Sequence, residues 1–215
     1  GIYDLFLVAI FNPKSQIINH QSTMLLGYNT NGFADHDLLD AVGLLAEMGY
    51  RSVAITIDHG AFSPRDQDWR RQAACLGELL QRHGMRSVME TGARFLLDPR
   101  IKHEPTLMTA DPAGRQRRID FLRHVIDVAK MLTSDCVSLW SGILRDEASE
   151  EKALDRLVGG LSQVIDYAAG QGVRLGFEPE PGMFIDTLGR YEELLERLDF
   201  PRFGLTLDVG PLPCP

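Results

Sequence analysis

Two acidic residues near the end of the chain each follow a short apolar run. Glu178 follows residues 175–177 (Leu-Gly-Phe), and Asp208 follows residues 205–207 (Leu-Thr-Leu). Such runs are typical of buried strands in a parallel sheet, whose carboxyl ends face the ligand. Turn-forming proline and glycine come soon after both acids, so each strand should end there. We therefore expect two carboxylates at one ligand-facing edge, where such groups can transfer protons and bind cations.

Alternating strand-like and helix-like segments would position these acids. Six apolar runs rich in β-branched or bulky residues predict strands over 25–30, 52–57, 86–91, 136–141, 173–178 and 203–208. The amphipathic segments between them predict helices over 37–48, 67–83, 114–133, 149–171 and 187–198. One of these helices shows a clear buried stripe, formed by Ile119, Leu122, Val125, Ile126 and Ala129. Helix ends are indicated by Asp35 or Asp37, Ser149, Asp186-Thr187, Gly84 and Gly172.

Strict alternation of strand and helix predicts an α/β fold with right-handed crossovers. Two architectures satisfy it, a doubly wound open sheet and a (β/α)8 TIM barrel. A dinucleotide-binding open sheet would carry a Gly-x-Gly-x-x-Gly turn after its first strand, whereas residues 30–33 (Thr-Asn-Gly-Phe) contain a single glycine. We therefore expect a TIM barrel domain over residues 24–215, truncated after strand six. Residues 1–23 would form an N-terminal extension outside it.

The composition excludes several classes of partner. The formal net charge of −8 repels nucleic acid and anionic membranes, and no run of about 18 apolar residues could span a bilayer. Three unpaired cysteines, Cys75, Cys136 and Cys214, indicate reduced thiols and a cytoplasmic protein. The apolar run 5–11 lacks a basic flank and a cleavage site, so we do not interpret it as a signal peptide.

Polar side chains collect at the carboxyl ends of the predicted strands. These residues are Asn29, Asn31, Asp58, His59, Glu90, Trp140, Glu178 and Asp208. We expect Glu178, His59 and Glu90 to be catalytic, and Trp140 and Asn29 to bind substrate. His103 joins the second group because it lies in the connection 92–113, which is long enough to be a lid or a binding loop.

Structural roles compete with each of these assignments. Glu178 could pair with Arg174, and Glu90 with Arg86 or Arg94. Trp140 could belong to the core, His59 could face solvent, and His103 could lie on a mobile surface segment. A further cluster, Arg115, Arg117, Arg118 and Arg123, could bind a phosphate, but its helical spacing favours a solvated helix face.

Two motifs carry a resemblance to a known family. Residues 176–181 (Gly-Phe-Glu-Pro-Glu-Pro) and 205–210 (Leu-Thr-Leu-Asp-Val-Gly) resemble strands five and six of the xylose isomerase-like TIM barrel family. The segment 90–107 is similar to a strand-three loop in some of its members. The resemblance implies that Glu178 and Asp208 bind a divalent metal, which could be Mn²⁺, Mg²⁺, Co²⁺ or Zn²⁺.

The chain departs from the family pattern after Asp208. The family places a histidine three residues further on, where this sequence has Pro211. The family also draws a histidine from strand seven and a glutamate from strand eight, and the chain ends before both. The chain therefore contains only half of the residues that bind the metal in the family.

The resemblance implies a metal-dependent sugar or sugar phosphate isomerase or epimerase. Such an enzyme moves a proton between adjacent carbons of a small carbohydrate through an enediolate. Three alternatives stay open: a polyol dehydratase, an endonuclease IV-like hydrolase, and a catalytically inactive barrel fragment. The protein could also form a homo-oligomer.

Overall fold

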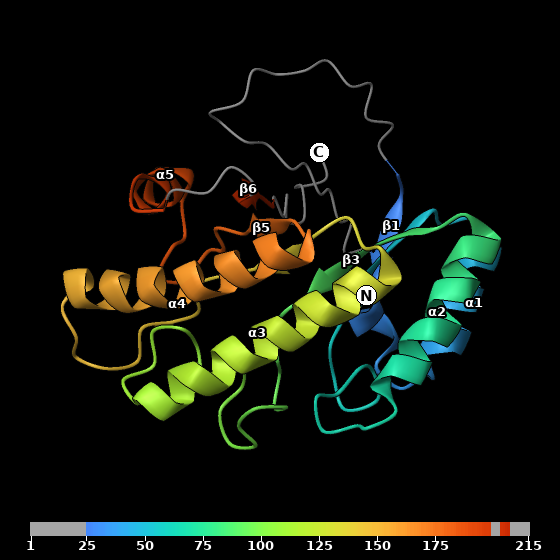
Figure 1. The fold of residues 1–215 in the computed structure, drawn as a ribbon, viewed down its shortest axis with the longest axis horizontal. Coiled ribbons are helices and arrows are strands. Elements are labelled where there is room, and N and C mark those ends of the chain that lie inside the picture. The colour runs from blue at the N-terminus through green and yellow to red at the C-terminus, as the bar shows by residue number, and fades with distance from the viewer. Residues whose placement is uncertain (1–24, 199–202, 207–215) are drawn as a thin grey trace, which may run out of the picture.

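A computed structural model describes residues 25–198 and 203–206, which form one six-stranded parallel sheet covered by helices (Figure 1). The strands follow chain order across the sheet: β1 (Gly27–Asn29), β2 (Ser52–Thr56), β3 (Arg86–Glu90), β4 (Val137–Leu139), β5 (Leu175–Phe177) and β6 (Phe203–Leu205). The helices are α1 (Leu38–Glu47), α2 (Trp69–His83), α3 (Pro112–Leu132), α4 (Glu150–Gln171) and α5 (Leu188–Glu196). A short 3-10 helix, η1 (Thr30–Phe33), follows β1.

All six predicted strands and all five predicted helices are confirmed, with small differences at their ends. Side chains of Asp37, Ser149 and Thr187 cap the starts of α1, α4 and α5, as the sequence indicated. Helix α3 begins two residues before its predicted start. Asp111 accepts hydrogen bonds from the backbone N–H groups of Ala113 and Gly114, and proline is favoured in the first turn that follows such a cap.

The register divides the strand residues between two faces of the sheet. Paired residues lie side by side across β2 to β5: Thr56, Glu90, Ser138 and Gly176. Because side chains alternate along a strand, these positions share one face, which we call the inner face. The residues that alternate with them include Ile55, Met89 and Phe177, which pack in the main core.

The inner face is lined by small and polar residues rather than by large apolar ones. Its apolar part is a separate small cluster of Ala54, Val88 and Cys136. Each of these residues precedes by two positions the residue of its own strand that belongs to the paired row with Glu90. Glycine is required where backbones and side chains approach closely on this face. A Cβ atom at Gly176 would lie 2.2 Å from the Thr206 hydroxyl oxygen. The inner face can therefore hold polar groups such as Glu90.

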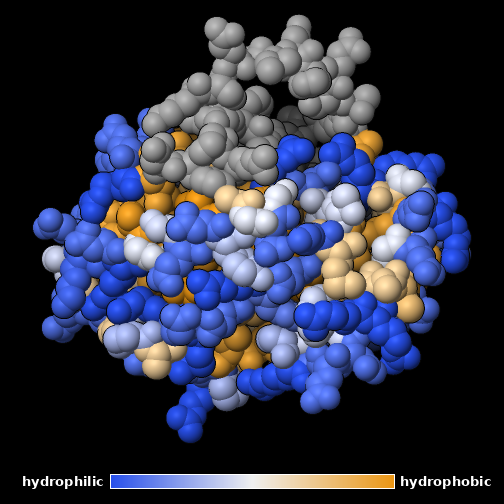
Figure 2. Space-filling view, in the orientation of Figure 1, coloured by the Kyte–Doolittle hydropathy of each residue, from blue (hydrophilic) through white to orange (hydrophobic). Residues whose placement is uncertain are grey.

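The helices pack against the other face and present polar surfaces outward. The predicted stripe of α3 is buried throughout, and α3 packs between α2 and α4. Figure 2 shows a largely hydrophilic surface on the side where α3 and α4 lie, with apolar residues visible only between polar ones. Among the described residues, no helix combines the length and apolar character needed to cross a membrane.

The interpretation of Arg118 as part of a solvated helix face is wrong. Only 2% of its surface is exposed, and its guanidinium donates a hydrogen bond of 2.8 Å to the backbone carbonyl of Thr91. Arg118 neighbours the buried stripe of α3 and reaches the carboxyl end of β3 from there. Burial lowers the pKa of Arg118 to about 10, which still leaves it charged at neutral pH.

The long connection between β3 and α3 is packed onto the body of the protein. Its apolar side chains Ala93, Leu96, Leu107 and Met108 are buried in the main core. The carboxylate of Glu104 is also buried, and it accepts hydrogen bonds of 2.9 Å from the Thr109 hydroxyl and from the guanidinium of Arg145. Both ends of the loop are therefore packed, while residues 99–102 between them are exposed.

Candidate functional site

The carboxyl end of β2 continues into a tight turn that fixes Asp58. Asp58 and Ala61 exchange two backbone hydrogen bonds of 3.0 and 3.1 Å. One carboxylate oxygen of Asp58 accepts the backbone N–H of His59 at 2.8 Å, and the other lies 3.2 Å from the guanidinium of Arg94. The Asp58 carboxylate is thus held at both oxygens, while the His59 ring is exposed.

Arg94 is held in an unusual backbone conformation by His103. Its φ of 43° lies in the left-handed region, which costs free energy for a residue with a side chain. The backbone N–H of Arg94 donates to Nδ1 of His103 at 3.0 Å, and the backbone N–H of His103 donates to the carbonyl of Arg94. This pair of hydrogen bonds fixes the direction in which the Arg94 side chain leaves the loop.

His103 also contacts Trp140, which directly follows β4. The two rings meet edge to face with their centroids 5.3 Å apart. The Arg118 guanidinium lies 5.2 Å from the centroid of the Trp140 ring, and Trp140 is only 8% exposed. Asp58, Arg94, His103 and Trp140 therefore form a continuous series of contacts from the end of β2 to the end of β4.

His103 is kept neutral at physiological pH. Burial is the main cause that lowers the pKa of His103 from 6.5 to about 4. The positive charges of Lys102, Arg118 and Arg94 act in the same direction. A neutral ring leaves Nδ1 with a lone pair, which is what the N–H of Arg94 requires.

The stability of the protein should consequently fall on acidification. The folded pKa of His103, about 4, lies below its unfolded value near 6.5, so the unfolded chain binds the proton first. The free energy of unfolding should decrease as pH drops from 6.5 to 4. A His103→Asn variant should show a shallower decrease in urea denaturation across this window. An identical slope in the variant and the wild type would contradict the assignment.

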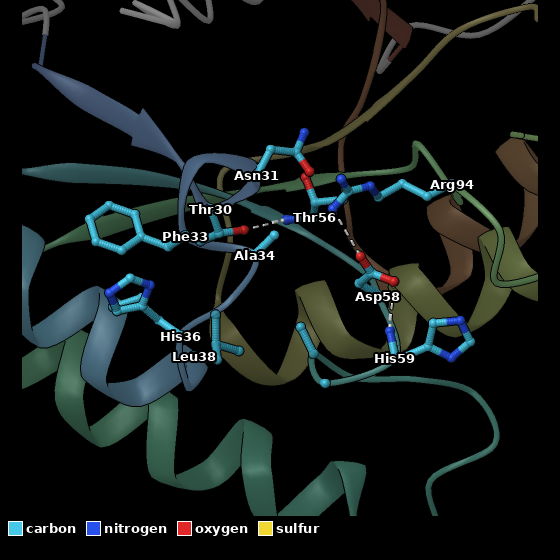
Figure 3. A pocket seen from close by; sticks show the side chains of 13 residues that line it. Thr30, Asn31, Phe33, Ala34, His36, Leu38, Thr56, Asp58, His59 and Arg94 are labelled. Atoms are coloured by element: carbon cyan, nitrogen blue, oxygen red, sulfur yellow. Dashed lines mark hydrogen bonds and ion pairs between the residues drawn. The ribbon is translucent and has the colours of Figure 1, made fainter. Parts of the chain in front are cut away.

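A cavity of about 270 Å³ adjoins the Asp58–Arg94 pair (Figure 3). It lies between η1, the start of α1 and the turn after β2. Thr30, Asn31, Thr56, Asp58, His59 and Arg94 are among its polar lining residues, and Phe33, Ala34, Leu38, Ala41 and Ala61 are apolar.

Asn29, expected to bind substrate, has its side-chain oxygen engaged within the fold. That oxygen accepts the backbone N–H of Asn31 at 2.9 Å and the hydroxyl of Thr56 at 3.1 Å. Asn29 is buried and caps η1. Asn31, two residues further on, lines the cavity instead.

Glu178 and Glu90 lie buried at the carboxyl edge of the sheet. Glu178 follows β5 directly, is 6% exposed, and donates its backbone N–H to the carbonyl of Leu139 at 2.9 Å. Glu90 is the last residue of β3 and is 7% exposed. Both belong to the inner face. Glu90 pairs with Ser138, which in turn pairs with Gly176, and Glu178 stands two residues after Gly176 along the same strand direction.

Two of the three arginines considered as partners of these acids form ion pairs with other carboxylates. Arg174 precedes β5, so it stands at the strand end opposite to Glu178, about 13 Å of extended chain away. Arg86 pairs with Asp135, and Arg94 with Asp58.

The described residues do not by themselves form a metal site. Residues 25–198 and 203–206 contain no group of three or more His, Cys, Asp or Glu side chains that could hold a metal ion. Glu178, one of the two expected ligands, is buried, and carboxylate oxygens are hard donors that suit a divalent cation. The second expected ligand, Asp208, lies outside the described residues.

Parallel strands in chain order, with intervening helices and polar groups at their carboxyl ends, define a β/α-barrel type of protein. Residues 42–212 match the xylose isomerase-like TIM barrel family. The chain belongs to this family, which confirms both the fold class and the resemblance seen in the sequence. A search of curated proteins finds no match.

Solved structures of the same fold are longer than this chain. It resembles a protein from Sinorhizobium meliloti 1021 with 24% identity and a TM-score of 0.63, covering 84% of this chain and 61% of that one. A D-psicose 3-epimerase from Clostridium cellulolyticum H10, solved with D-tagatose, gives 16% identity, a TM-score of 0.67, and coverage of 83% and 61%. The IolI protein, solved with a bound zinc atom, has 17% identity and a TM-score of 0.64, and the match covers 85% of this chain and 62% of IolI. The chain thus spans about three fifths of these proteins.

Proposed function

We propose that this protein is a metal-dependent isomerase or epimerase of a small sugar or sugar phosphate. The observation that carries the proposal is the burial of Glu178 at the carboxyl edge of a barrel of the xylose isomerase-like family. Ligands bind at this edge in such folds. Similar solved structures include sugar 3-epimerases, which supports a carbohydrate as the substrate class.

Two carboxylates on one face suit the transfer of a proton at a carbon next to a carbonyl. Strand β4 separates β3 from β5, and Glu178 stands two residues beyond the position level with Glu90, so the backbones at Glu90 and Glu178 are about 12 Å apart. That span admits a sugar between the two side chains. One carboxylate would remove the proton to give an enediolate, and a proton returned to the other face or to the adjacent carbon would complete epimerisation or isomerisation.

Other rim residues would orient the sugar. Trp140 would offer apolar ring surface to its C–H groups, with His103 and Arg118 holding the ring in place. The exposed His59 would contact a hydroxyl group. Polarisation of the carbonyl and of its neighbouring hydroxyl is the chemistry that a divalent cation held by Glu178 and Asp208 would supply.

Metal removal tests this proposal. We expect the protein to interconvert ketose epimers or aldose–ketose pairs, to lose this activity after chelation, and to regain it when Mn²⁺, Mg²⁺, Co²⁺ or Zn²⁺ is added. Proton NMR of a panel of free and phosphorylated ketoses measures the conversion directly. Full activity in the chelated protein, or no conversion of any sugar with any of the four metals, would overturn the proposal.

A further inference from the structure

We propose that the cavity beside Asp58 and Arg94 is a subsite for the non-reacting end of an uncharged, unphosphorylated sugar. The inference rests on the proposed function, because it assigns the reacting end of the same sugar to the carboxylates at β3 and β5. It adds a substrate class and two residues, Asp58 and Arg94, that contact the substrate.

The balance of charge in the cavity favours a neutral ligand over a phosphate. Among the described residues that line the cavity, Arg94 is the only arginine and none is a lysine. Its guanidinium already lies 3.2 Å from a carboxylate oxygen of Asp58. A phosphate carries up to two negative charges and would meet that carboxylate as well as the arginine. A sugar hydroxyl can instead donate to Asp58 and accept from Arg94 at once.

The size and lining of the cavity match a sugar fragment. About 270 Å³ is slightly below the range of roughly 300–1,000 Å³ seen for drug-sized ligands. Asn31 adds an amide that donates and accepts, while Phe33 and Leu38 supply apolar surface for C–H groups. Figure 3 shows the Arg94 side chain reaching toward Asp58 across one side of the cavity, with Phe33 and Leu38 on another.

His103 makes this arrangement rigid without entering the cavity. Its two hydrogen bonds to the backbone of Arg94 hold the left-handed turn, so the guanidinium is placed before a ligand arrives. A donor fixed in advance loses less conformational entropy on binding. His103 is therefore a positioning residue for Arg94, in addition to its contact with Trp140.

Binding measured separately from turnover tests the subsite. The metal-supplemented wild-type protein is titrated with the D-2-ketohexoses by calorimetry, and then with the 6-phosphate of the ketohexose that binds best. We expect the phosphate to bind about tenfold more weakly or worse. Arg94→Gln and Asp58→Asn should each weaken binding of the free sugar about tenfold or more, because each removes a hydrogen bond to a charged group.

Control variants separate this inference from the proposed function. Arg100→Gln makes the same change at an exposed position of the same loop and should bind like the wild type. Glu178→Gln should lose turnover while Arg94→Gln still weakens binding in that background. If binding follows these expectations but no variant, nor the wild type, converts the sugar, the subsite stands and the proposed function fails.

Three outcomes would overturn the subsite. These are tighter binding of the phosphate than of the free sugar, unchanged binding in a folded Arg94→Gln protein, and no binding of any ketohexose by the wild type. Thermal unfolding of each variant establishes that it is folded. Arg94→Lys provides a second variant that keeps the charge but loses the planar fork, and it should bind more weakly than the wild type.

Discussion

Replacing Glu178 by glutamine should lower the turnover of a ketose by about 10²–10⁴-fold, the usual contribution of a positioned acid or base. Glutamine keeps the size of the side chain but can neither take up a proton nor balance the charge of a cation. Glu178 is buried at the carboxyl edge of the sheet, so bulk water has little access with which to replace it. The loss should therefore appear in kcat rather than in KM alone.

The matched control for this variant is Glu192→Gln. Glu192 lies on the exposed side of α5, so this substitution makes the same chemical change away from the site. Its turnover should stay within about twofold of the wild type. Conversion is followed by proton NMR at saturating sugar with the metal present. A Glu178→Gln protein that retains wild-type kcat would remove Glu178 from the chemistry.

Replacing Phe177 by alanine should lower the free energy of unfolding by about 3–5 kcal/mol. The Phe177 ring is fully buried and stacks on Tyr191 with centroids 5.8 Å apart. It also lies 5.8 Å from the ring of Phe203 on β6. Its removal leaves a cavity between β5, β6 and α5, directly before Glu178, so turnover should fall as well.

Urea denaturation of Phe177→Ala beside Phe95→Ala measures this effect. Phe95 is 48% exposed, and its truncation should change the free energy of unfolding by no more than about 0.5 kcal/mol. Equal destabilisation by the two substitutions would mean that Phe177 is not part of the core that anchors β5.

The elements could be predicted because their signals are local. A short apolar run marks β5 and a period-3.6 pattern of apolar residues marks α3, and the caps at Asp37 and Ser149 are read within four residues of sequence. The alternation of strand and helix is compatible with few topologies, so a parallel sheet could be predicted from it. Glu178 and Glu90 were found for the same reason, since each stands where a strand ends.

The cavity and its contacts depend on interactions between distant residues. Arg94 and His103 meet only because a left-handed turn folds the loop back, and nothing in the sequence around Arg94 signals that conformation. Asp58 appeared in the sequence as one polar strand-end residue among several. The prediction for Arg118 was wrong because helical spacing shows only the direction in which its side chain leaves α3. It does not show that the guanidinium can reach the backbone carbonyl of Thr91. The functional roles assigned to the predicted site residues, Glu178 and Glu90 included, remain predictions.

In the proposed reaction, the carboxylates at the ends of β3 and β5 move a proton at a carbon next to a carbonyl. The most direct measurement is NMR detection of solvent deuterium entering the bound sugar in D₂O, with the wild type and Glu178→Gln compared in the presence of the metal. We predict exchange at one carbon next to the carbonyl in the wild type and at least about 10²-fold slower exchange in the variant. Epimerisation or isomerisation without any deuterium incorporation, or equal exchange in both proteins, would contradict the account.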